Sequence, residues 1–477
     1  MQLSKPKIEL LYGSIFGLIG GIVVIWMIGT IPTTSKSFWV SFVIIAIAVL
    51  IWSFKGGKNW WMAFVVFVTF GGVFWVGFKI YPAEIGLLFA IMALVFATVI
   101  KGKNLRQDRS KISWAFSLLI LYFILHMLAS LYKANVGLMN GGGSIIRSYS
   151  TGMTFLVFGW LYYRFGSTKN ITNVFIIILI INSIRIGFGL YAYFFSYTSS
   201  LSEPGWTFLG LSTDLRSSVL YQIYAAIIIF YLIKNRNLKV GVLLLIVLSF
   251  IIVFLGQGRV AVLEAMLAIS LWVIIEKRYG LLIFILSIFI FLFILVNTKV
   301  YEDLPFEIQR SVSFMVLNKN KIYSYYPFAS DQWHFDLFKT GFDNWSDSAY
   351  SLFFGNCIDP SDVWRFGSFD FFNQVKIASA MARYESSLWT VLATLGIIGI
   401  SLYTWVLTFL FRNIIPIVKR DGIKSFNHAV YAIAIISFVL MILLGWIRGG
   451  FPDYEIMLGV MGKSLYEDRK KVISNTS

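Results

Sequence analysis

Apolar runs of close to 20 residues recur along most of this 477-residue chain, and they restrict its fold more than any other feature. A helix of about 20 apolar residues is long enough to cross a hydrocarbon core about 30 Å thick. The composition agrees, because 58% of the residues are hydrophobic and only 13% are charged, whereas soluble domains carry about 25% charged residues. The sequence therefore predicts an all-α polytopic membrane protein and excludes a water-soluble globular one.

Thirteen apolar spans are separated by polar breaks. They cover residues 8–30, 38–54, 60–80, 84–100, 113–132, 148–165, 171–197, 217–233, 238–256, 259–275, 280–298, 387–411 and 429–447. A Gly-Gly and Pro break follows, and then a weaker apolar stretch that fits a short returning helix. We therefore expect about 13–14 transmembrane helices: helices 1–11 in residues 1–298, one large extracytoplasmic loop in residues 299–386, and C-terminal helices with a basic tail in residues 387–477.

Lysine and arginine outnumber the acids by 40 to 23, and most of them collect in alternate loops. These loops lie at residues 55–58, 101–111, 164–169, 234–239, 277–278 and 412–424. Since cytoplasmic loops are enriched in cations, the pattern assigns them to the cytoplasm. The net charge of +17 is then explained by topology, and no nucleic acid partner is expected.

Five arginines break this rule, because they fall at the predicted extracytoplasmic ends of helices. They are Arg147, Arg216, Arg259, Arg383 and Arg448. An arginine fork binds phosphate in bidentate fashion and keeps its charge at low dielectric. Such a cluster at the outer headgroup level suits a diphosphate on a lipid. The alternative is that each arginine reaches lipid phosphates or pairs with a loop acid.

Other ionisable residues within spans are open to two interpretations. Arg185 lies near the middle of its span, where a charge usually faces a cavity or a partner. Glu264 is the candidate partner, as a structural ion pair or as part of a ligand site. His126 is expected to pack between helices. His334, beside Trp333 in the long loop, is the only histidine on the outer side and a candidate substrate contact.

Motifs of soluble enzymes and of metal sites are missing from the sequence. It has no P-loop, no GxGxxG after a strand, no HExxH and no CxxC, and Cys357 is its single cysteine. A DxD pair, which holds nucleotide sugars with Mg²⁺, does not occur in a loop either. We therefore expect neither a metal nor a cofactor.

Two segments around the long loop carry a resemblance. They are FLGQGRVAVLEAMLAISLWV (254–273) and ARYESSLWTVLATLGIIGISLYTWVL (382–407). The matching positions are Gly256, Gly258, Arg259, Glu385, Ser386, Trp389, Gly396 and Gly399. This arrangement resembles the O-antigen polymerase and ligase superfamily of bacterial envelope glycan enzymes. Its members have a dozen or so spans, a Gly-Ser-Arg-like turn entering a helix, a large periplasmic loop, and a following helix with a Gly-x-x-Gly pattern.

One departure favours one branch of that superfamily. The ligase branch has a histidine where this chain has Glu385, as polymerase-like members often do. The resemblance thus implies a glycosyltransferase that polymerises polyprenyl-diphosphate-linked repeat units at the outer face of the bacterial cytoplasmic membrane, in O-antigen, capsule or exopolysaccharide synthesis. A ligase using another acceptor and a flippase of lipid-linked sugars stay open as alternatives.

The expected reaction assigns a role to each candidate residue. Arg259 neutralises the leaving diphosphate, with Arg147, Arg216, Arg383 and Arg448 as helpers. Glu385 is the base for the acceptor hydroxyl, or else an acid that stabilises the first turn of a helix. The candidate glycan contacts are Trp333, His334, Tyr325, Tyr326 and Trp364. The expected partners are the lipid-linked donor and acceptor, the bilayer and a chain-length regulator protein.

Overall fold

The computed structural model describes residues 110–134, 143–165, 167–194, 207–208, 211–212, 216–255, 259–304, 308–309, 312–317, 325–356, 386–445 and 453–476. These residues are helical except for connections and a small hairpin, β1 (Thr207–Phe208) antiparallel to β2 (Leu211–Ser212). The predicted all-α polytopic class is confirmed. The four predicted spans before residue 101 lie outside the described residues.

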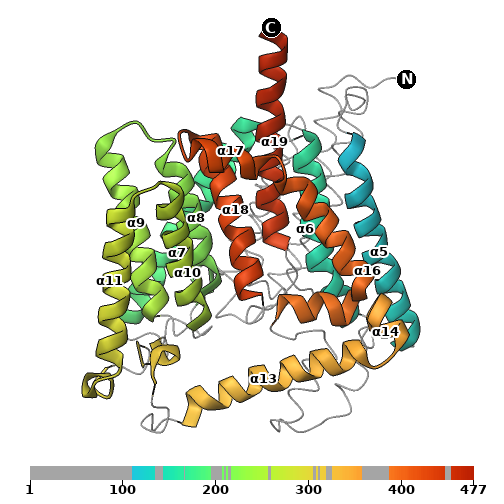
Figure 1. The fold of residues 1–477 in the computed structure, drawn as a ribbon, viewed down its shortest axis with the longest axis horizontal. Helices are drawn as coiled ribbons and strands as arrows, with labels where there is room; N and C mark the ends of the chain where they lie inside the picture. The colour runs from blue at the N-terminus through green and yellow to red at the C-terminus, as the bar shows by residue number, and fades with distance from the viewer. Residues whose placement is uncertain are drawn as a thin grey trace, which may run out of the picture.

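The long helices run up and down through one bundle (Figure 1). Their bounds are α5 (Ser110–Ala134), α6 (Gly143–Phe165), α7 (Thr168–Phe194), α8 (Arg216–Phe230), α9 (Arg236–Leu255), α10 (Arg259–Ile275), α11 (Tyr279–Val296), α16 (Ser387–Phe411), α18 (Phe426–Leu444) and α19 (Asp453–Thr476). Shorter elements are the 3-10 helices η3 (Lys299–Tyr301) and η4 (Ser313–Met315) and the helices α14 (Ala349–Phe354) and α17 (Ile414–Asp421). The predicted spans match α5 to α11, α16 and α18 to within a few residues.

Five of the described helices are long and apolar enough to cross a membrane. They cover Trp114–Lys133, Arg236–Val253, Tyr279–Val296, Ser387–Phe411 and Phe426–Leu444. Only 6% of the α11 window is buried, and exposed side chains along it include Phe284, Ile290 and Phe291. A helix that is apolar all round and uncovered by protein is stable in lipid but not in water. The chain is therefore a multi-pass membrane protein.

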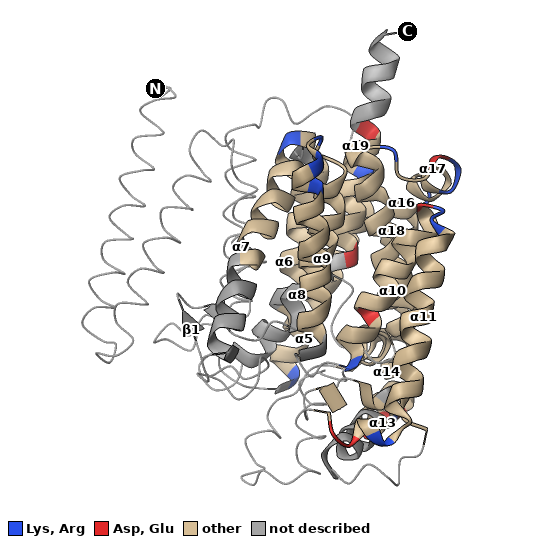
Figure 2. Cartoon of the chain, turned by 90° about the vertical axis from the view of Figure 1, so that its left-hand side faces the viewer, with Lys and Arg blue, Asp and Glu red and all other residues tan. Residues whose placement is uncertain are grey.

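The two ends of the bundle differ in charge and in covering. The connections α8–α9 and α10–α11 lie at one end together with α17, and they carry the basic residues of the loops at 234–239, 277–278 and 412–424 (Figures 1 and 2). We call this the basic end. At the opposite end, α13 (Tyr325–Ser346) lies across the bundle (Figure 1). We call this the α13 end. The sequence predicted short helices in this loop, whereas α13 has 22 residues.

The last helix, α19, runs from the α13 end back to the basic end between α6, α16 and α18 (Figure 1). Residues 455–465 of α19 are buried, among them Lys463, whose Nζ lies 3.9 Å from Glu467 and over the ring of Phe409. Protein surrounds this part of the helix, so its polar side chains find partners there instead of lipid. This explains why the sequence shows only a weak apolar stretch where the structure has a 24-residue helix.

Candidate functional site

The five arginines that break the sidedness rule lie in sequence within five residues of the first residue of a helix. Arg147 is in the second turn of α6, and Arg216 and Arg259 are the first residues of α8 and α10. These helices, like α16 and α19, begin at the α13 end (Figure 1). Arg383 and Arg448 precede α16 and α19 in sequence but lie outside the described residues, as do the side chains of Arg147 and Arg216. Helix starts carry partial positive charge, so these five starts favour anions at this end.

Arg259 is half-buried, and its positive charge acts on Tyr301 of η3. Burial raises the pKa of the Tyr301 phenol, and the charge of Arg259 offsets part of that rise. The phenol donates to the Gln309 carbonyl at 3.0 Å. Gln309 Nε2 donates in turn to the carbonyls of Glu302 and Leu304, at 3.1 and 2.8 Å. These hydrogen bonds hold the buried Tyr301 phenol at a place where the charge of Arg259 lowers its pKa.

The start of α16 is bonded to the end of α18. Ser386 is the N-cap: its Oγ accepts the Trp389 backbone N–H at 3.4 Å and donates to the Gly445 carbonyl at 2.9 Å. The Leu388 backbone N–H reaches the same carbonyl at 3.4 Å. Glu385 directly precedes this cap and lies outside the described residues. The helix therefore begins after Glu385, and the serine takes the capping position.

An aromatic cluster fixes α13 to the first turn of α16. The Trp389 ring meets Phe338 and Phe342 edge-on, with centroid distances of 5.0 and 5.6 Å, and Trp345 at 5.8 Å. Trp345 Nε1 also donates to the Leu352 carbonyl of α14 at 3.2 Å. Each edge-on aromatic pair adds about 0.5–1.5 kcal/mol beyond area burial. These contacts hold α13 across this end of the bundle.

The predicted glycan contacts belong largely to the first half of α13. Tyr325, Tyr326, Trp333 and His334 lie on this helix, of which the structure describes the backbone alone at these positions. Trp364 lies outside the described residues. Tyr326 and Trp333 are seven residues apart, which puts them on one face of the helix. Contact of these side chains with a glycan stays a prediction.

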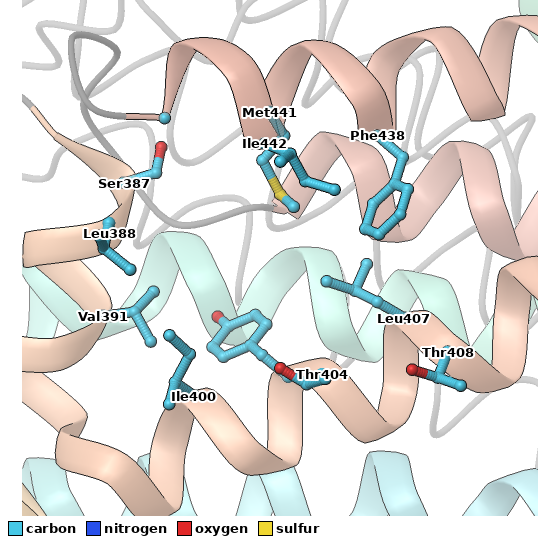
Figure 3. A pocket seen from close by; sticks show the side chains of 12 residues that line it. Ser387, Leu388, Val391, Ile400, Thr404, Leu407, Thr408, Phe438, Met441 and Ile442 are labelled. Atoms are coloured by element: carbon cyan, nitrogen blue, oxygen red, sulfur yellow. The ribbon is translucent and has the colours of Figure 1, made fainter.

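An apolar cavity of about 390 Å³ lies between α16 and α18 (Figure 3). Its lining includes Val391, Leu407 and Phe438, and Ser387 and Gly445 stand at its α13 end. Its volume is in the range of about 300–1,000 Å³ typical of small-molecule sites. Apolar cavities do not hold ordered water, and both α16 and α18 are long and apolar enough to cross a membrane. The cavity therefore suits a hydrocarbon chain.

The remaining candidates are interior residues. Glu264 is buried on α10, but the side chain of Arg185 lies outside the described residues, so their pairing stays a prediction. His126 is buried on α5, with its ring 4.9 Å from that of Tyr122, as expected of a packing histidine. Within the described ranges, no three histidine, cysteine or carboxylate side chains gather as a metal ion would require.

Sequence reasoning missed a break within α16. Gly396 has φ 65° and ψ −167°, so two half-helices, residues 387–395 and 397–411, meet there. The Gly-x-x-Gly pattern of Gly396 and Gly399 does not predict this break, because small residues at such spacing are also typical of close packing between intact helices. Tyr122, whose hydroxyl donates to the Leu395 carbonyl beside the break at 2.8 Å, carries no sequence signal of that role.

The chain was also compared with known protein families and with curated proteins. No family model and no curated protein matches it.

Proposed function

We propose that this protein is a glycosyltransferase that polymerises polyprenyl-diphosphate-linked oligosaccharide repeat units at the outer face of the bacterial cytoplasmic membrane. The product would be an O-antigen, capsule or exopolysaccharide. One observation carries the proposal: α6, α8, α10, α16 and α19 all start at the α13 end, each with an arginine within five residues of its first residue in sequence. Positive helix ends and arginine forks in one region favour a diphosphate.

The proposed step is a displacement at the anomeric carbon of the donor sugar. The oxygen of an acceptor hydroxyl attacks this carbon, the bond from the carbon to the diphosphate oxygen breaks, and polyprenyl diphosphate leaves with the bonding electrons. Glu385 accepts the hydroxyl proton. Arg259 neutralises the charge that develops on the leaving group, with four helpers: Arg147, Arg216, Arg383 and Arg448. The broken bond supplies the energy, so the step needs no nucleotide.

The surroundings of the candidate residues support a lipid-linked substrate. The apolar cavity between α16 and α18 ends at Ser387, two residues after Glu385 in sequence. A hydrocarbon tail in this cavity would bring its headgroup to the α13 end. The aromatic side chains of α13 would then lie on the polar side of the membrane, where rings stack on sugars. A chain-length regulator protein is the partner proposed to act on the glycan as it grows.

Two substitutions test the assignment in a host that lacks its own polymerase. Arg259→Lys keeps the charge but loses the planar fork, and Glu385→Gln keeps the shape but loses the base. Each should shorten the polymer strongly in a gel of extracted glycan, while the amount of protein in the membrane stays normal. Arg236→Lys, at the exposed start of α9 on the basic end, is the matched control and should leave polymer length unchanged. Wild-type polymer from Arg259→Lys would defeat its assignment.

A further inference from the structure

Helix α16 is interrupted within the membrane, and α14 fills the interruption. At Gly396 the backbone has φ 65° and ψ −167°, a conformation essentially restricted to glycine. Backbone groups freed by such a break need partners, because lipid offers none. Gly355, the residue that ends α14, has a similar conformation, φ 77° and ψ 177°. The two glycines meet, and we call their contact the α14–α16 joint.

The joint is a contact of backbone against backbone. A Cβ atom at Gly396 would lie 2.3 Å from the Phe353 carbonyl oxygen and 2.5 Å from the Gly355 nitrogen. A Cβ atom at Gly355 would lie 2.3 Å from the Thr394 carbonyl. Neither contact is relieved by turning a side chain, since backbone atoms are on both sides. Each position therefore requires glycine for two reasons, its conformation and its space.

Hydrogen bonds satisfy the carbonyls that the break leaves free. The Asn356 backbone N–H donates to the Ala393 carbonyl at 2.7 Å. The Tyr122 hydroxyl, from α5, lies 2.8 Å from the Leu395 carbonyl and 3.2 Å from the Phe354 carbonyl. Tyr122 thus touches both sides of the joint and ties it to a third helix.

The joint also fixes the chain on either side of the segment 357–385. Asn356, held on Ala393, is the last described residue before that segment, and Ser386, which caps α16, is the first one after it. Both flanks of the segment are consequently bonded to the first half of α16. The segment ends in Glu385, and the described residue next to it in the sequence is Ser386, the cap of this half-helix.

We infer that Tyr122, Gly355 and Gly396 are positioning residues of the proposed transferase. They hold the first half of α16, the half-helix that follows Glu385 in the sequence, against α14. The inference rests on the proposed function. It assigns Tyr122, Gly355 and Gly396 no contact with Arg259, which belongs to α10, a different helix. Misplacing a catalytic group by about 1 Å costs on the order of 100-fold in rate.

The test uses the purified full chain with a lipid-linked repeat unit as donor and acceptor. Tyr122→Phe removes the hydroxyl without adding an atom and should lower kcat about tenfold, because the joint loses a hydrogen bond whose single proton is shared between two carbonyls. Gly396→Ala should lower kcat about 100-fold. The number of donor-binding sites per molecule should stay unchanged and KM for the donor should change less than kcat, because Arg259, the first choice for holding the diphosphate, belongs to α10. Loss of folded protein alone would reduce the number of sites instead.

The matched control is Gly241→Ala on α9, where a Cβ atom meets nothing within 4 Å. This variant should keep wild-type kcat. If Tyr122→Phe also keeps wild-type kcat in an active preparation, the positioning inference is overturned while the proposed function stands. If the wild-type protein itself transfers no glycan, the proposed function fails first, and the positioning role fails with it. Tyr122→Phe decides the question even if Gly396→Ala does not fold.

Discussion

Replacing Gly396 by alanine should destabilise the α14–α16 joint by about 2–6 kcal/mol. The first contribution is conformational, since a non-glycine residue in this backbone region costs about 1–3 kcal/mol. The second comes from the Cβ atom, which would lie 2.3 Å from the Phe353 carbonyl oxygen and so must push α14 away. Separation breaks the bond from the Asn356 N–H to the Ala393 carbonyl, and an unpaired buried carbonyl costs about 1–3 kcal/mol.

Two other glycines separate these contributions. Gly422, which ends α17, has φ 63° and ψ −153°, close to the values at Gly396, but its nearest atom to an added Cβ is the Ile275 carbonyl oxygen at 3.5 Å. Gly422→Ala should therefore show the conformational cost alone, about 1–3 kcal/mol. Gly241 lies within α9 with no atom within 4 Å of an added Cβ, so Gly241→Ala should stabilise the protein by about 0.5–1 kcal/mol.

Hydrogen exchange in detergent micelles measures the local effect. The α14 amides of Leu352 and Gly355 donate within the helix at 2.9 and 2.8 Å. They should exchange at least about tenfold faster in Gly396→Ala, since 1.4 kcal/mol corresponds to a factor of about ten. Gly422→Ala should leave them unchanged, because α17 is at the other end of the bundle (Figure 1). Equal exchange of these amides in the two variants would refute the steric account of the joint.

Two further predictions concern the α13 end. Trp389→Ala removes the centre of the aromatic cluster and should lower the unfolding free energy by about 3–5 kcal/mol in a detergent titration. The control is Trp405→Ala, which should lower it clearly less because the Trp405 side chain is 50% exposed. Arg259→Gln removes the charge that lowers the pKa of Tyr301, so NMR of labelled tyrosine should show the phenol titrating at higher pH, and an unchanged titration would contradict their proximity. Burial raises the pKa of the Tyr301 phenol above its ordinary value of 10.0. The protonated phenol therefore contributes to the free energy of unfolding below pH 10.0, and this contribution is lost as the pH rises through the raised pKa.

The sequence predicts the membrane helices well because their ends are marked by charged and polar residues. The predicted spans 259–275 and 387–411 coincide with α10 and α16. The sequence does not reveal the break at Gly396, since apolar residues continue through it and its partner Gly355 belongs to a different element. It also gives too weak a signal for α19, because a helix enclosed by protein keeps polar residues such as Lys463 that a lipid-facing helix excludes.

For the candidate site, topology was predictable and side-chain geometry was not. Alternation of spans puts the starts of α8 and α10 at one end, and the structure agrees for Arg216 and Arg259. The effect of the Arg259 charge on the pKa of Tyr301 depends on where η3 packs, and no apolar period guides that prediction. The role of Tyr122 depends on a tertiary contact across 273 residues, which no local pattern encodes.

Glycosyl transfer between lipid-linked units is tested most directly by measuring glycan length with the purified protein. Purified protein in detergent is supplied with a polyprenyl-diphosphate-linked repeat unit, without a membrane or a gradient, and the glycan length is followed by gel and mass spectrometry. A polymerase should produce a ladder of glycans that lengthen by whole repeat units, with release of polyprenyl diphosphate. Glycans of unchanged length, together with movement of the same lipid across the membrane of protein-containing vesicles, would contradict it and identify a flippase.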